Sequence, residues 1–284
     1  MKKPLCQHFD LVFGTSTGAI IAALLGKGKT VEDIHTLYVK HVPTVMKAGS
    51  KWFPNFERSR KAKSAALASL ANTVFENDKF DVFQTGVALV AANWKDEQPF
   101  IFKNDVSQAH GMKSSFVPGW GCTISDAVQA SCSAYPFFER KIITKNNKDV
   151  VEAVDGGYCA NNPTLYALAD ALKPLNKLPE DIRLLNVGVG SYPAPPKPWT
   201  VRFANRFETV QLLQKTIDIN SLSMERLRSL MFNHIQTVRI SDSFNSPELA
   251  TDFLEHDLDK LNLLHQRGRA SFGSQEAVIT KLLA

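Results

Sequence analysis

The pentapeptide Gly14-Thr15-Ser16-Thr17-Gly18 is the segment whose residue types are most suited to chemistry. It follows an apolar, β-favouring segment at 8–13 and precedes small and aliphatic residues at 19–25. This is the strand–turn–helix setting in which G-x-S-x-G exposes a nucleophilic serine. Gly14 and Gly18 would relieve crowding in the turn, and the Thr17 N–H would stabilise an oxyanion at the helix start. The alternative interpretation is a turn without chemistry.

A serine nucleophile needs a base, and Asp155 is the stronger candidate. It follows a short predicted strand at 150–154 and precedes Gly156 and Gly157, which let another backbone approach closely. A buried carboxylate with a raised pKa could accept the Ser16 proton directly. We therefore expect Ser16 Oγ and an Asp155 oxygen to lie about 2.6–3.2 Å apart. The alternative interpretation is a D-G-G hairpin turn.

A conventional triad would take its base from a later histidine, and His234, His256 and His265 follow Asp155 in the chain. The order Ser, Asp, His is that of the α/β-hydrolases. However, His234 precedes the last predicted strand, and the other two lie among leucines in helical segments. Surface or structural roles are favoured for His256 and His265, and a triad esterase remains the weaker alternative.

Two glycine-containing segments do not qualify as nucleotide sites. Gly28-Lys29-Thr30 ends like a P-loop, but Ala23 occupies the required first glycine position. Gly188-Val189-Gly190 lacks a third glycine at the dinucleotide spacing, where Pro193 stands. The cysteines form no C-x-x-C pair, so we predict neither a metal nor a cofactor.

The composition is that of an ordinary globular protein, with 284 residues, 44% hydrophobic and 21% charged. The net charge of +5 is too small to argue for DNA or RNA, and it suits approach to an anionic lipid surface. The longest apolar run, 19–25, is far shorter than a membrane span. No signal peptide is recognisable. Four scattered cysteines favour a reducing cytoplasm: Cys6, Cys122, Cys132 and Cys159.

Predicted strands and helices alternate along the chain, which favours an α/β fold with a largely parallel sheet. The strands fall at 8–13, 83–92, 99–102, 150–154, 183–189 and 237–240. The helices fall at 19–25, 31–40, 65–75, 124–132, 164–172 and 204–232, with two short ones within 246–283. The prolines at 193–198 could mark a domain boundary. One domain is preferred, because the strand at 237–240 needs a sheet to join.

A basic stretch at 47–63 interleaves aromatic residues with cations. It could be a membrane-contacting or nucleotide-sensing insertion, although a solvated loop with its aromatics in the core is favoured. Phe137 and Phe138 fit either the core or an acyl pocket. The residues of the stretch are Lys47, Lys51, Trp52, Phe53, Phe56, Arg58, Arg60, Lys61 and Lys63.

Four motifs in order resemble the patatin-like phospholipases. They are the elbow at 9–20, the segment 130–138 (A-S-C-S-A-Y-P-F-F), the segment 155–163 (D-G-G-Y-C-A-N-N-P) and the strand 183–191 (R-L-L-N-V-G-V-G-S). The resemblance implies a three-layer α/β sandwich with helices on both faces of a mostly parallel sheet. It implies that Ser16 is the nucleophile and Asp155 the base of a dyad without histidine. The implied activity is metal-independent hydrolysis of lipid acyl esters, of phospholipase A type.

The segment 252–272 is similar to bacterial patatin-like effectors of anti-phage systems. Those effectors are activated by a cyclic oligonucleotide and degrade the membrane of the infected cell. This resemblance implies a membrane phospholipid as substrate, a cyclic nucleotide activator, and a cytoplasmic location at the inner face of the membrane. We expect no DNA or RNA partner.

The family's glycine-rich oxyanion loop, D-G-G-G-x-R-G, has no counterpart before the elbow. Only 13 residues precede Gly14, and none of them is glycine. We therefore expect residues 1–284 to be one N-terminally incomplete domain that hydrolyses lipids slowly. An open sheet edge near 8–13 would invite a homo-oligomer. The alternative function is a catalytically impaired lipid-binding or regulatory module on the same scaffold.

Overall fold

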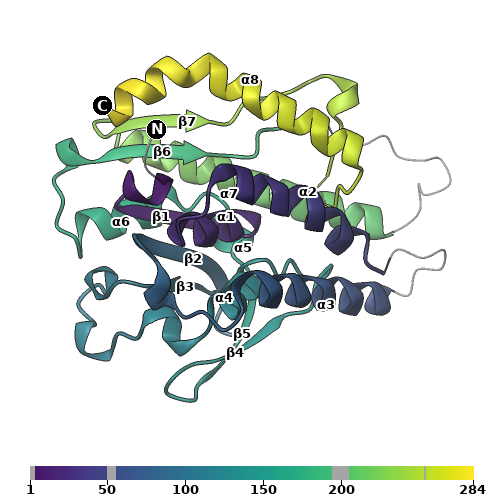
Figure 1. Ribbon diagram of the computed structural model, residues 1–284, viewed down its shortest axis with the longest axis horizontal. Helices are drawn as coiled ribbons and strands as arrows, with labels where there is room; N and C mark the ends of the chain where they lie inside the picture. The colour runs from purple at the N-terminus through teal and green to yellow at the C-terminus, as the bar shows by residue number, and fades with distance from the viewer. Residues whose placement is uncertain (1–3, 50–55, 194–204, 253) are drawn as a thin grey trace. The chain divides into compact units, whose positions relative to one another are not determined.

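The computed structural model describes residues 4–49, 56–193, 205–252 and 254–284 (Figure 1). The chain forms two compact units, Met1–Lys177 and Leu178–Ala284. The first unit contains the elbow and Asp155, and the second contains the C-terminal strands and helices. Whether they act as the single domain expected from the sequence stays a prediction.

The first unit is built on a sheet whose central strand is β2. In this sheet β1 pairs with β2 in parallel, whereas β3 and β5 pair with β2 and β4 pairs with β5, all antiparallel. The strand order is β1-β2-β5-β4, with β3 also on β2. The strands are β1 (Leu11–Thr15), β2 (Gly86–Asn93), β3 (Gln98–Lys103), β4 (Lys141–Thr144) and β5 (Val150–Asp155).

Helices surround β2 so completely that its residues from Val87 to Ala92 are all buried. A strand buried on both sides needs cover on both faces of its sheet. Helices α1, α4 and α5 contact β2, and α6 contacts β1. The helices of this unit are α1 (Thr17–Gly26), α2 (Val31–Lys47), α3 (Phe56–Phe75), α4 (Ile124–Ser131), α5 (Gly157–Ala160) and α6 (Thr164–Leu172).

The α/β class predicted from the sequence is confirmed. The sheet was expected to be largely parallel, but the first sheet is mixed, with β1 paired in parallel and its other pairings antiparallel. Short connections at 94–97 and 145–149 join β2 to β3 and β4 to β5. Connections this short allow only antiparallel neighbours. Strand β4 was not predicted, and α2 continues past the expected end at 40 with Pro43 inside the helix.

The second unit has a two-stranded parallel sheet of β6 (Arg183–Val187) and β7 (Gln236–Ile240). The strand expected near 237–240 therefore joins β6. Helix α7 (Asn205–Met231) lies between them in the chain, and α8 (Leu258–Leu283) packs Ile279 and Leu282 against Val238. The prediction of two short helices within 246–283 is wrong, because α8 is one helix of 26 residues.

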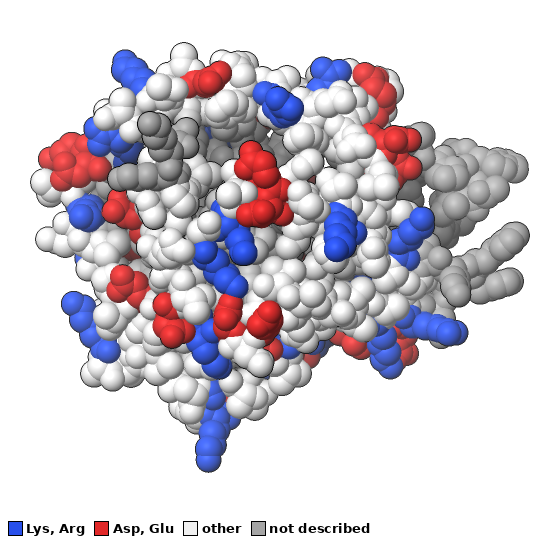
Figure 2. Space-filling model, in the orientation of Figure 1, with Lys and Arg blue, Asp and Glu red and all other residues white. Residues whose placement is uncertain are grey.

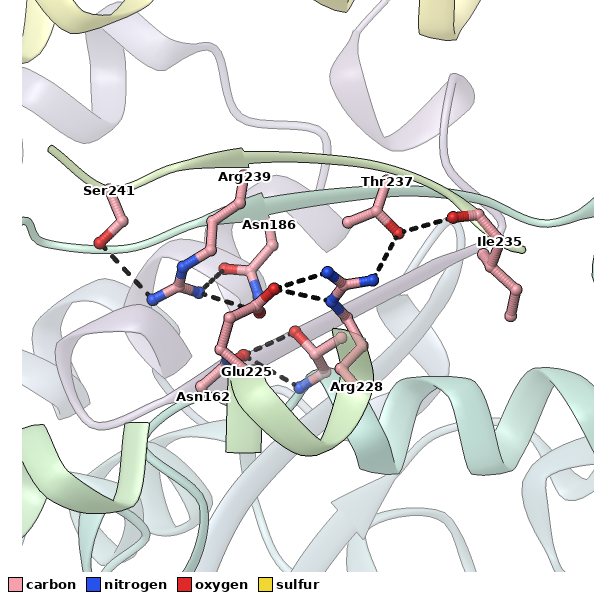
Figure 3. A network of polar contacts seen from close by, with 9 residues as sticks. Asn162, Asn186, Glu225, Arg228, Ile235, Thr237, Arg239 and Ser241 are labelled. Atoms are coloured by element: carbon pink, nitrogen blue, oxygen red, sulfur yellow. Dashed lines mark hydrogen bonds and ion pairs between the residues drawn. The ribbon is translucent and has the colours of Figure 1, made fainter. Parts of the chain in front are cut away.

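A polar network attaches α7 to this sheet (Figure 3). Glu225 Oε1 accepts hydrogen bonds from Nε and Nη2 of Arg228, at 2.8 and 2.7 Å. Arg228 Nη1 also donates to Thr237 of β7 at 3.2 Å. Arg239 of β7 donates to Asn186 of β6 at 2.8 Å. Arg228 therefore links α7 to β7, and Arg239 links β7 to β6.

Candidate active site

Strand β2 positions the two candidate catalytic residues side by side. Thr15, the last residue of β1, lies opposite Val90, and Asp155, the last residue of β5, lies opposite Ala91. Because β3 occupies one hydrogen-bonding edge of β2 over this stretch, β1 and β5 share the other edge. Their carboxyl ends therefore meet, although Ser16 and Asp155 are 139 positions apart in the chain.

The turn after β1 has the backbone of a strained elbow. Ser16 has φ 54° and ψ −127°, a conformation that side-chain-bearing residues rarely adopt. A Cβ on Gly14 would lie 2.2 Å from the Gly18 carbonyl oxygen, so only glycine fits at 14. A Cβ on Gly18 would meet nothing within 4 Å. The expectation that both glycines relieve crowding is therefore correct for Gly14 and wrong for Gly18.

The predicted contact between Ser16 and Asp155 is present. Ser16 Oγ donates to Asp155 Oδ2 at 2.6 Å, and the Gly157 N–H donates to Oδ1 at 2.7 Å. Gly156 lets the turn after β5 lie close to β2, because a Cβ there would lie 2.1 Å from the Val90 carbonyl oxygen. The pair has the geometry of a nucleophile and its general base.

Burial sets the acidity of Asp155, which is only 2% exposed. Loss of hydration raises its pKa from 3.8 to about 6, although the hydrogen bonds from Ser16 and Gly157 favour the carboxylate and act in the opposite direction. A base with a pKa near 6 is mostly ionised at neutral pH and still attracts a proton. Ser16 itself is partly exposed.

Ser131 supports the elbow from behind, a role that the sequence motifs did not identify. It is fully buried. Its Oγ accepts the Ser16 N–H at 2.9 Å and donates to the Val90 carbonyl at 2.6 Å. Nearby, the Asp155 N–H donates to the Ser133 carbonyl at 3.0 Å. Both serines lie in the segment 130–138, so the resemblance pointed to this segment but not to the contacts.

The start of α1 supplies the candidate oxyanion donor. Because the Ser16 N–H is engaged by Ser131, the donor of the elbow that can face an oxyanion is the Thr17 N–H. The first N–H groups of a helix have no acceptor within it. Tyr38 Oη donates to the Thr17 carbonyl at 2.6 Å and holds this turn in place.

Two cysteines near Asp155 are poor nucleophiles. Burial, followed by the charge of Asp155, raises the pKa of Cys159 to about 11 and that of Cys132 well above its ordinary value. Both therefore remain thiols at neutral pH, and only a thiolate is an effective nucleophile. Ser16 is consequently the stronger nucleophile candidate at this site.

Of the remaining sequence candidates, some belong to the second unit, some to other elements of the first unit, and some fall outside the described residues. His234, His256 and His265 belong to the second unit. Residues 50–55 of the basic stretch, including Lys51, Trp52 and Phe53, lie outside the described residues.

The described ends of the basic stretch belong to α2 and α3. Within them, Lys63 is buried, and its Nζ donates to the Met46 carbonyl and, at 3.1 Å, to the Ala48 carbonyl. Phe137 and Phe138 are buried. Thr30, from the P-loop-like segment, caps α2. Among the described residues no cluster of three potential ligands could hold a metal, and no helix could cross a membrane.

A serine elbow between a strand and a helix, on a mixed α/β sheet, is typical of serine hydrolases that act on acyl esters. The family model described as "Patatin-like phospholipase" matches residues 2–168, and the chain belongs to this family.

Curated relatives agree with this assignment. The chain is 55% identical over 280 residues to the "cUMP-AMP-activated phospholipase" of Escherichia coli, covering 99% of this chain and 85% of that protein. It is 25% identical over 196 residues to the "cGAMP-activated phospholipase" of Vibrio cholerae, covering 64% and 53%. It is 22% identical over 291 residues to "Patatin-like protein 1" of Arabidopsis thaliana, covering 91% and 68%.

Proposed function

We propose that this chain hydrolyses acyl esters of membrane phospholipids through a Ser16–Asp155 dyad. The observation that carries the proposal is the 2.6 Å hydrogen bond from Ser16 Oγ to the buried Asp155 carboxylate. Membership of a phospholipase family supports the substrate class.

The reaction follows from the contacts. As Ser16 Oγ attacks the ester carbonyl, its proton passes to Asp155 Oδ2, and the negative charge on the carbonyl oxygen is stabilised by the Thr17 N–H. Protonated Asp155 then gives this proton to the departing alcohol oxygen, which leaves an acyl-Ser16. In the second half, Asp155 accepts a proton from water, the hydroxide attacks the acyl carbon, and the proton returns to Ser16 as the fatty acid departs.

The test is hydrolysis of phospholipid vesicles by dyad variants. Ser16→Ala and Asp155→Ala should each abolish release of fatty acid, and a fluorophosphonate probe should label the unaltered chain but not Ser16→Ala. As controls, alanine at His234, His256 or His265 should leave the rate unchanged. Loss of activity on replacing one of these histidines, with Asp155→Ala active, would favour a triad instead.

We further propose that a cyclic dinucleotide activates the hydrolysis. The support is the similarity to the E. coli and V. cholerae relatives, both named as phospholipases activated by such molecules. Because the identity to the first is much higher, cUMP-AMP should stimulate the vesicle assay more than cGAMP does. Equal rates with and without either compound would contradict this part of the proposal.

We also propose that this protein is cytoplasmic and contacts the inner membrane surface peripherally. We expect it to form a homo-oligomer and to bind neither DNA nor RNA. On the face in Figure 2, acidic and basic side chains are interspersed, so this face is not a uniformly cationic surface. Nucleic-acid sites gather cations on one surface. Size measurement on a column, with and without vesicles, tests the oligomer and the membrane contact together.

A further inference from the structure

An arginine and three aromatic rings cluster at the turn that follows β2. The Arg140 guanidinium lies 4.5 Å from the ring centre of Trp94 and 4.5 Å from that of Tyr135. The Trp94 ring centre lies 5.7 Å from that of Tyr135 and 6.4 Å from that of Tyr158. Tyr158 Oη donates to the Tyr135 carbonyl. These contacts hold the cluster in one arrangement.

The cluster lies next to the dyad. The Trp94 N–H donates to the Glu152 carbonyl at 2.8 Å, and Glu152 precedes Asp155 by three positions of β5, or about 10 Å of strand. Since β1 ends at Thr15, these positions of β2 and β5 extend beyond the carboxyl end of β1, where Ser16 lies. Tyr158 follows Asp155 by three residues. The charge of Asp155 helps, after burial, to raise the pKa of Tyr158 to about 12.

The cluster combines an exposed aromatic face with a cation whose hydrogen bonds are incomplete. Trp94 is 40% exposed, and the Arg140 side chain is 27% exposed. Arg140 Nη1 donates to Glu152 at 2.8 Å, whereas its Nε is buried with no partner among the described residues. A second cation, Arg60, lies 5.7 Å from the Tyr135 ring centre. A buried N–H without an acceptor suggests a missing partner.

We propose that Trp94, Tyr135 and Arg140 form a docking site for the phosphate-bearing headgroup of a membrane phospholipid, beside the dyad. This inference rests on the proposed hydrolase function and names the group that orients its substrate. Tryptophan and tyrosine suit the membrane–water interface because their rings are apolar with a polar edge. Guanidinium groups pair with phosphate oxygens through parallel N–H bonds. The headgroup would sit on Arg140 while the ester reaches Ser16.

Vesicle binding tests the site without turnover, so the proteins carry Ser16→Ala throughout. Binding is compared on vesicles of phosphatidylglycerol with phosphatidylcholine and on vesicles of digalactosyl diacylglycerol, which contain no phosphate. Arg140→Gln should weaken binding to the phospholipid about fivefold and leave binding to the galactolipid unchanged. Trp94→Ala should weaken binding to both. Exposed residues of the second unit serve as matched controls, with Arg226→Gln and Phe272→Ala expected to bind normally.

Glu152→Gln separates docking from a structural role, because it removes the carboxylate that competes for Arg140. It should strengthen phospholipid binding, whereas loss of a merely structural ion pair would weaken it, as Arg140→Gln does. Arg140→Lys should keep the thermal midpoint and recover part of the binding. Unchanged phospholipid binding by Arg140→Gln, or weaker binding by Glu152→Gln, would overturn the site. Absence of hydrolysis by the protein that retains Ser16 would instead count against the proposed function. The binding results would still test the docking site, because they do not depend on turnover.

Discussion

Asp155→Asn should abolish hydrolysis and yet make the protein more stable. The substitution keeps the shape of the side chain and removes its charge. The asparagine Oδ1 can still accept the Gly157 N–H, and its amide can donate to Ser16 Oγ. It cannot accept the Ser16 proton, so acyl transfer should stop, while the fold no longer has to contain a charge at a position that is 2% exposed.

The size of the gain follows from the acidity of the carboxyl group. Its pKa rises from 3.8 to about 6 on burial, and a tenfold change in proton affinity corresponds to about 1.4 kcal/mol. Ionised Asp155 therefore costs the fold about 3 kcal/mol. Between these pKa values the native state binds more protons than the unfolded chain, so its stability falls as pH rises from about 4 to about 6. The Asp155→Asn variant does not lose stability in this way, because the asparagine side chain does not ionise.

Urea unfolding at two pH values measures the effect. Asp155→Asn should raise the free energy of unfolding by about 3 kcal/mol at pH 7.5 and by about 1 kcal/mol at pH 4.5. Asp149→Asn is the control. Lys145 and Asn147 hold the pKa of this exposed carboxyl below its ordinary value, so its replacement should not stabilise the protein. If Asp155→Asn destabilises the protein at both pH values, the hydrogen bonds to the carboxylate outweigh its burial and the reasoning fails.

Three further outcomes are expected. The kcat/KM for a soluble ester should fall about tenfold from pH 7 to pH 5 as Asp155 is protonated; a flat profile would contradict its role as base. Ser131→Ala should lower the free energy of unfolding by about 2 kcal/mol and slow hydrolysis, and an unchanged rate would mean that the elbow needs no support from α4. In urea unfolding Gly14→Ala should be strongly destabilised, whereas Gly18→Ala should gain about 1 kcal/mol from helix propensity; equal losses would contradict the contacts at Gly14.

Most elements could be predicted from local pattern, because their apolar spacing and capping residues are local. Helix α6 begins and ends as predicted, at Thr164 and Leu172. Strand β4 could not be predicted, because only Ile143 of its four residues is buried, and it forms by pairing with β5. The extension of α2 across Pro43 and the unbroken α8 likewise depend on packing that outweighs local breakers.

The two residues of the candidate site could be predicted from the sequence, but the contacts that surround them could not. Ser16 follows the end of a strand between Gly14 and Gly18, and Asp155 ends a strand directly before Gly156, which are local signals. The contacts of Ser131 are made by a buried hydroxyl between two distant backbones, and no residue spacing encodes them. Gly18 shows the opposite error, because a motif position was given a steric role that the surrounding space does not require.

The tail-to-tail meeting of β1 and β5 on one edge of β2 has a consequence for how the chain tolerates change. Each catalytic candidate takes its place from its own register on β2, with Thr15 at Val90 and Asp155 at Ala91. Pairing with β2 therefore sets the positions of both residues, and the connection between β3 and α4 does not contribute to them. Insertions or deletions in that connection should leave the distance between Ser16 and Asp155 unchanged. One slipped pair on β2 would separate them, even though every residue of the site were intact.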